Sequence, residues 1–226
     1  MYLIIVGLGG IGRSLTAVAT RANNSVVVID KDEKRCADVL EHYDVLAITG
    51  SSTDKEVLEA AGIERADALV ATTSDDSVNL MTCWSAKHYD VPNVVSIVNK
   101  TEHSEFFKEV GVKISENPDE LVANMLYYWS RNPNLTQFAH LPSGSVFEIR
   151  VDENSPIIDK EIREVEVKDF VFVAIQRAGG GLIIPSGSVK IRPNDIITVF
   201  TKKEAEDETL KMLNAQLISK GGSKLI

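Results

Sequence analysis

The sequence predicts an α/β protein, in which a Rossmann-type, doubly wound parallel sheet is followed by a second, smaller α+β domain. Three observations predict this fold class. An apolar run at residues 2–6 leads directly into glycines with G-x-G-x-x-G spacing. Apolar runs then alternate with helical patterns as far as residue 131, which is typical of parallel strands covered on both faces. Beyond residue 141 the apolar runs are short and separated by turns, so a different kind of domain is expected there.

The first domain, residues 1–131, is predicted to contain a sheet of parallel strands joined by helices. Continuous apolar runs predict strands at 2–6, 26–29, 45–48, 68–71 and 94–98, with a shorter one at 112–114. Helical spacing of apolar residues predicts helices between them, at 11–22, 34–41, 55–61, 77–89 and 105–110. In such a fold the ligand crevice lies at the carboxyl ends of the strands.

The helix predicted at residues 118–131 closes this domain and is apolar on more than one stripe. Its apolar residues at helical spacing are Leu121, Val122, Met125, Leu126, Tyr128 and Trp129, which exceeds what packing on a single domain requires. Either the helix is sandwiched between two domains of its own chain, or it forms a subunit interface. The aromatic cluster favours the interface.

The rest of the chain is predicted to consist of a linker, a small domain and a tail. Residues 132–141, which contain Pro133 and precede Pro142, are predicted to be the linker. The small α+β domain, 142–218, is predicted to have strands at 146–151, 170–176, 182–184 and 196–200, followed by a polar helix at 203–213. Residues 219–226 are predicted to be a tail without fixed structure.

The glycine motif predicts a dinucleotide site. Gly7 suits the tight turn from strand to helix, Gly9 lets the backbone approach a pyrophosphate, and Gly12 lets the helix pack closely on the strand. The N–H groups at the start of the following helix favour phosphate. Asp30 lies 18 residues beyond Gly12, near the ~20 residues expected of the carboxylate that accepts hydrogen bonds from ribose hydroxyls.

The composition is typical of a soluble globular protein with an excess of acid. The chain has 226 residues, of which 44% are hydrophobic and 25% charged. Its formal net charge of −9 argues against a nucleic-acid partner, because phosphate contacts need a basic surface. No apolar run approaches the ~20 residues of a membrane span, and no signal peptide precedes the first strand. Any work at a membrane is therefore expected to go through a partner.

The cysteines and histidines do not predict a metal site. Cys36 and Cys83 fall within helical patterns and are predicted to be buried or half-buried free thiols, in keeping with a reducing compartment. The chain has four scattered histidines and no C-x-x-C motif, so zinc is not expected.

A series of longer motifs runs in a fixed order through both predicted domains. They are G-L-G-G-I-G-R at 7–13, I-D-K-D at 29–32, T-G-S-S-T at 49–53, L-E-A-A-G-I at 58–63, A-D-A-L-V-A-T-T-S-D-D-S-V-N at 66–79, N-P-D-E at 117–120 and I-P-S-G-S-V-K-I-R-P-N-D-I-I-T-V at 184–199. With these motifs the chain resembles, over nearly its full length, the cytosolic regulators of potassium transport built from RCK domains, the TrkA/KtrA type.

The resemblance implies a regulatory nucleotide in the crevice, either NAD/NADH or ATP/ADP, and not a redox cofactor. An aspartate at Asp30 repels a 2′-phosphate and so disfavours NADP. Arg13 is placed to reach the terminal phosphates, unless it is a solvated surface arginine. Asp32 either assists Asp30 or caps the next helix, and Asp75 is expected to be a helix cap. The predicted nucleotide contacts are Gly7, Leu8, Gly9, Gly10, Ile11, Gly12, Arg13, Asp30, Lys31, Asp32, Gly50, Ser51, Thr72, Thr73 and Asn79.

The sequence departs from the pattern of these regulators after the fifth strand. Many relatives carry a basic residue where Ile97 stands, so one expected phosphate or nicotinamide contact is missing. Calcium-gated relatives carry acids where this chain has Val98, Asn99 and Lys100, so no calcium site is predicted there. Asp119 matches an acid that approaches a bound cation in the family, but one carboxylate does not define a site.

The resemblance implies a binding switch, and an NAD-dependent oxidoreductase is the alternative. Hydride transfer needs a substrate pocket with a general acid or base, and the second half offers only His140 in a small domain. The switch is expected to be a cytoplasmic homo-oligomer, with domains pairing through residues 77–89 and assembling into a ring. The ring docks on a membrane-embedded potassium channel or transporter, without inserting into the membrane itself.

Overall fold

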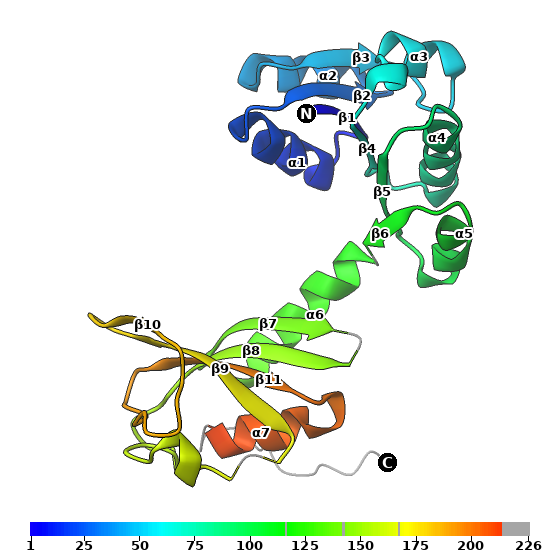
Figure 1. Cartoon of the computed structure of the whole chain (residues 1–226). Helices are drawn as coiled ribbons and strands as arrows, with labels where there is room; N and C mark the ends of the chain where they lie inside the picture. Colours follow the sequence, from blue (N-terminus) through cyan, green and yellow to red (C-terminus); the bar gives the residue numbers. More distant parts are fainter. Residues whose placement is uncertain (116, 142, 167, 214–226) are drawn as a thin grey trace. The chain divides into compact units, whose positions relative to one another are not determined.

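The structure is a computed structural model that describes residues 1–115, 117–141, 143–166 and 168–213 (Figure 1). The chain divides into two compact units, Met1–Leu121 and Val122–Ile226. Each unit has a sheet and a hydrophobic core of its own. The predicted tail, residues 219–226, lies outside the described residues.

The first unit is built on a six-stranded parallel sheet in the order β3-β2-β1-β4-β5-β6. The strands are β1 (Tyr2–Val6), β2 (Ser25–Asp30), β3 (Leu46–Thr49), β4 (Ala68–Ala71), β5 (Asn93–Ile97) and β6 (Lys113–Ser115). The helices are α1 (Gly10–Arg21), α2 (Glu33–His42), α3 (Lys55–Ala60), α4 (Asp76–His88), α5 (Ser104–Glu109) and the start of α6 (Pro118–Arg131). This is the predicted Rossmann-type sheet. Its strand order changes direction between β1 and β4, and such folds bind ligands at this topological switch point.

Both faces of this sheet are buried, which explains the continuous apolar runs. Alternate residues of a strand point to opposite faces. In β1, Leu3 and Ile5 pack with α1 and α2, in a core that includes Ala19 and Val39. Ile4 and Val6 of the same strand belong to the opposite core, which the following helices cover through residues such as Leu58, Cys83, Ala86 and Phe107. Cys36 and Cys83 are buried free thiols, as predicted.

The second unit contains a five-stranded antiparallel sheet in the order β10-β9-β11-β8-β7. Its elements are β7 (Leu135–Leu141), β8 (Gly144–Arg150), β9 (Phe170–Arg177), β10 (Gly181–Ile183), β11 (Ile196–Thr201) and α7 (Glu206–Leu213). Phe147, Ile175, Ile197 and Leu210 are among the residues of its core. The prediction of a smaller α+β domain is therefore confirmed.

Two boundaries differ from the predictions. The predicted linker, residues 132–141, is mostly strand β7, because it forms a hairpin ladder with β8 and buries Leu135 in the second core. The first unit ends at Leu121 and not at residue 131. The end of α6 belongs to the second unit, because Tyr128 and Trp129 pack on its core and the Tyr128 hydroxyl donates to Glu206 over 2.8 Å.

Among the described residues, no helix is long and apolar enough to span a bilayer.

Candidate functional site

A cavity of about 440 Å³ lies where the carboxyl ends of the parallel strands meet. Its walls come from the end of β1 and the start of α1, the ends of β2 and β3, and the segments that follow β4 and β5. Nine of the residues predicted as nucleotide contacts line it: Gly7, Gly9, Gly10, Ile11, Asp30, Lys31, Gly50, Thr72 and Thr73.

The glycine turn combines one tightly packed position with an open one. Gly7 has a φ of +92°, which is unfavourable for residues with a side chain. A Cβ atom on Gly12 would lie 1.8 Å from the Gly7 carbonyl oxygen, so this position requires glycine for packing. A Cβ atom on Gly9 would meet nothing within 4 Å. Gly9 therefore keeps the cavity open and is not needed for packing within the protein.

The first turn of α1 offers unoccupied backbone donors to the cavity. Gly9 is its N-cap residue and supplies no side-chain hydrogen bond. The first N–H groups of a helix have no partner within the helix, and the helix dipole makes this end positive. Gly10 and Ile11, in this turn, line the cavity. The geometry is that of an anion site.

Asp30 is held in position by the backbone on either side of it. Its Oδ2 accepts a hydrogen bond from Leu8 N over 2.5 Å, and its Oδ1 accepts one from Asp32 N over 2.8 Å. Arg35 Nη1 lies 3.8 Å from the same carboxylate. Each carboxylate oxygen has two lone pairs, so the group can still accept hydrogen bonds from ribose hydroxyls.

Threonine and asparagine side chains fix the segment after β4. The Thr72 hydroxyl lies within 2.9 Å of the carbonyl oxygens of both Val6 and Gly7. Asn79 is buried, accepts a hydrogen bond from Thr73 N over 3.0 Å and donates one to Thr73 O over 2.9 Å. Asn79 therefore positions Thr73 and does not line the cavity itself.

The remaining predicted contacts lie beside or behind the cavity. Leu8 and Gly12 are buried. Asp32 caps α2 by accepting a hydrogen bond from Lys34 N. Arg13 pairs with Asp38 over 3.0 Å and lines a separate hollow between α1 and α2. At the end of β3 the cavity is lined by Ser52, whereas Ser51 was predicted.

Sequence reasoning missed other lining residues, of which Arg35, Ser52, Asp75, Ile97 and Asn99 carry the most chemistry. Asp75 is the N-cap of α4, as predicted, and also faces the cavity. Asn99 lies two residues after β5, and a polar residue so soon after a parallel strand was the available signal, because such residues lie at the carboxyl edge of the sheet. Arg35 lies in the first turn of α2, close to Asp30.

A buried carboxylate anchors the Asn99 segment to α4. Asp76 accepts hydrogen bonds from the backbone and side chain of Asn99, both over 2.8 Å, from Lys100 N over 3.0 Å and from His103 Nδ1 over 2.8 Å. Burial disfavours the charged form, but the hydrogen bonds from Asn99, His103 and Lys100 outweigh it and hold the pKa of Asp76 below its ordinary value. Asp76 thus fixes the wall that Asn99 contributes.

We expect Asp76→Asn to lower the free energy of unfolding by about 1–3 kcal/mol at pH 7, because an amide cannot accept all of these hydrogen bonds. A carboxylate with a lowered folded pKa stabilises the fold fully above its unfolded pKa of about 3.9, and less as the pH falls through the folded value. The difference in free energy of unfolding between wild type and variant, measured by urea denaturation, should therefore become smaller below pH 4. A gap that stays constant down to pH 2 would contradict this account.

The fold and the site together define a class. The chain is a Rossmann-fold protein with a dinucleotide-type crevice, joined to a small antiparallel α+β domain. Two family models match it in that order: the TrkA-N domain over residues 3–118 and the TrkA-C domain over residues 146–214.

Relatives and solved structures agree with these matches. A Trk system potassium uptake protein TrkA homolog of Methanothermobacter thermautotrophicus is 30% identical over 216 residues, covering 93% of this chain and 98% of the relative. The TrkA homolog of Pyrococcus abyssi is 29% identical over 222 residues, covering 94% and 97%. The GsuK channel bound to NAD has a TM-score of 0.64 and 19% identity, over 94% of this chain and 39% of the channel chain. The TrkA-N domain of the Escherichia coli inner membrane protein ybaL has a TM-score of 0.52 and 20% identity, over 56% of this chain and 95% of that domain. The chain belongs to the TrkA family.

Proposed function

We propose that this chain is a nucleotide-binding regulatory subunit of a potassium uptake system. One observation carries the proposal: the donor-rich start of α1 and the oriented carboxylate of Asp30 face the same cavity. The first suits a pyrophosphate and the second a ribose. The ligand is an adenine nucleotide or dinucleotide, NAD/NADH or ATP/ADP, and the contacts are the nine predicted residues that line the cavity.

The relatives favour regulation over hydride transfer. The match to TrkA potassium uptake proteins spans nearly the whole of both chains and includes the second domain. The GsuK channel, which shares the fold, was solved with NAD bound. A channel protein of this fold therefore binds NAD. The role that we propose for the ligand here is likewise to switch the protein between states and not to react.

Pairing between copies would carry the signal. Met81 and Trp84 on α4 are about half exposed, as are Leu126 and Tyr127 on α6. Large apolar side chains on two helices suit an interface with a second copy. We propose that paired copies form a ring on the cytoplasmic side of a membrane-embedded potassium channel or transporter. The nucleotide shifts the ring only by binding one of its states more tightly than the other.

The test is equilibrium binding of NAD, NADH, ADP, ATP and NADP to wild type and to Asp30→Ala. We expect wild type to bind NAD more tightly than NADP. Asp30→Ala should weaken binding by at least about 10-fold, because charge-assisted hydrogen bonds to the ribose are lost. Asp44→Ala is the matched control, because Asp44 is an exposed aspartate before β3 that does not line the cavity, and it should retain binding.

Three outcomes would contradict the proposal. If the wild-type protein binds none of these nucleotides, it is not a nucleotide-dependent switch. If the protein oxidises NADH in the presence of a small carbonyl substrate, the oxidoreductase alternative is favoured instead. A strict monomer by light scattering, with and without nucleotide, would contradict the ring.

A further inference from the structure

The cavity has two halves that differ in charge. Strand order places β2 and β3 on one side of the glycine turn and β4 and β5 on the other. We call the β2–β3 side the near half and the β4–β5 side the far half. The near half is lined by Asp30, Lys31, Arg35, Gly50 and Ser52, and the far half by Thr73, Ser74, Asp75, Ile97 and Asn99. A nucleotide with its ribose on Asp30 and its phosphates on the turn must extend whatever follows into the far half.

Positive side chains are confined to the near half. Among the described residues that line the cavity, the cations are Lys31 and Arg35, both beside Asp30. The far half instead carries the Asp75 carboxylate. The neighbouring Asp76 carboxylate does not line the cavity, and it is paired with His103 Nδ1 over 2.8 Å. A phosphate entering the far half would meet the negative charge of Asp75, and none of the described residues that line this half has a cationic side chain.

The backbone donors at the start of α4 do not compensate. A helix N-terminus ordinarily attracts phosphate. Here Asp75 Oδ1 already accepts hydrogen bonds from Ser77 N over 2.8 Å and from Val78 N over 3.3 Å. The protein's own carboxylate therefore occupies the position that an anion would take.

The other groups of the far half suit a flat ring that carries an amide better than they suit a phosphate. Ile97 is 8% exposed and presents an apolar surface, on which a charged phosphate would be poorly solvated. The Asn99 amide nitrogen donates to Thr73 O over 3.1 Å and to Asp76 Oδ1 over 2.8 Å. Its amide oxygen remains an acceptor, which matches the N–H donors of a carboxamide.

We infer that this crevice selects a nicotinamide dinucleotide over a nucleoside triphosphate, and that Asp75 is the residue that disfavours the triphosphate. The inference rests on the proposed function and narrows its ligand. The shared adenosine and pyrophosphate bind in the near half and on the turn. The nicotinamide riboside then occupies the far half, where a γ-phosphate would be repelled.

The test compares AMP, ADP, ATP and NAD by calorimetry in EDTA, so that no divalent cation bridges phosphate and carboxylate. In wild type, NAD should bind more tightly than ADP, and ATP no more tightly than ADP. Asp75→Asn removes the charge but keeps a good N-cap residue. It should strengthen ATP binding by about 3- to 10-fold and leave AMP unchanged. Asp44→Asn is the control. It removes an exposed charge just before β3, at the opposite end of the sheet, and should change none of the four binding affinities.

Two results would overturn the inference while leaving the proposed function in place. One is wild type that binds ATP more tightly than NAD. The other is an Asp75→Asn variant that is folded but has the NAD-to-ATP affinity ratio of wild type. Failure of wild type to bind any of the four ligands would overturn the proposed function, and this inference with it.

Discussion

Gly12→Ala should destabilise the first unit by more than about 3 kcal/mol, a cost at the upper end for overpacking. The new Cβ would lie 1.8 Å from Gly7 O and 2.8 Å from Thr72 Oγ1. Neither group can move aside easily, because Gly7 N donates to Ile29 O and the Thr72 hydroxyl is hydrogen-bonded to the same turn. Urea denaturation of the variant, followed by circular dichroism, measures the loss.

Gly9→Ala and Gly10→Ala are the matched controls, because a Cβ at either position meets nothing within 4 Å. Both variants should unfold within about 1 kcal/mol of wild type. Gly9→Ala should nevertheless weaken nucleotide binding, since its methyl group occupies the space at which a pyrophosphate approaches. Equal destabilisation by all three substitutions would show that Gly12 is not the packing-critical glycine.

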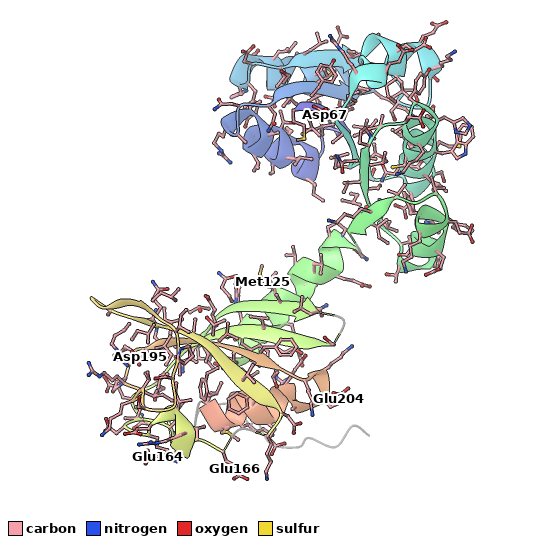
Figure 2. All side chains as sticks on the ribbon, in the orientation of Figure 1. Asp67, Met125, Glu164, Glu166, Asp195 and Glu204 are labelled. Atoms are coloured by element: carbon pink, nitrogen blue, oxygen red, sulfur yellow. The ribbon has the colours of Figure 1, made fainter. Side chains whose placement is uncertain are left out.

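Asp195→Ala should cost about 3–5 kcal/mol in the second unit, because it leaves a partly buried guanidinium without its partner. Asp195 is 1% exposed, and Figure 2 labels it in this unit. Arg177 Nε and Nη2 donate to its two oxygens over 2.9 and 2.7 Å, and Arg192 N donates over 2.9 Å. These contacts join the end of β9 to the turn before β11.

Tryptophan fluorescence can report this loss, because Trp84 lies in the first unit and Trp129 in the second. In a Trp84→Phe background, Trp129 emission follows unfolding of the second unit. Asp169→Ala is the matched control, since Asp169 pairs with Lys202 on the surface over 2.6 Å and should cost less than about 1 kcal/mol. If both variants lost a similar free energy of unfolding, the buried Arg177–Asp195 pair would be no more important to stability than the surface pair.

The fold of the first unit could be predicted because strands that are buried on both faces appear in the sequence as continuous apolar runs. Strands such as Tyr2–Val6 and Ala68–Ala71 are uninterrupted apolar runs, and the predicted and observed bounds coincide. Strand β7 could not be predicted in the same way. It is an edge strand of the second sheet, only Leu135 of it belongs to the core cluster, and the turn residues Asn132 and Pro133 precede it. Its pairing partner β8 had to be known first.

The candidate site divides along similar lines. Gly7, Gly9 and Asp30 were predictable, because their spacing expresses backbone geometry that is shared by all such turns. Whether Ser51 or Ser52 faces the cavity depends on the rotation of the chain after β3. Arg13 and Arg35 both lie in first turns of helices, and only the helix orientation decides that Arg35 lines the cavity.

The position of the division within α6 has a consequence for dissecting the protein. A fragment that begins at residue 146, where the match to the second family model starts, lacks strand β7 and the helix turn that carries Tyr128 and Trp129. The buried Glu206 then loses the hydrogen bond from the Tyr128 hydroxyl, and the part of the apolar core that Tyr128 and Trp129 cover is exposed to water. The smallest fragment that keeps the second unit intact is therefore expected to begin with α6 at Pro118, the last residue that the first family model matches and four residues before the second unit starts.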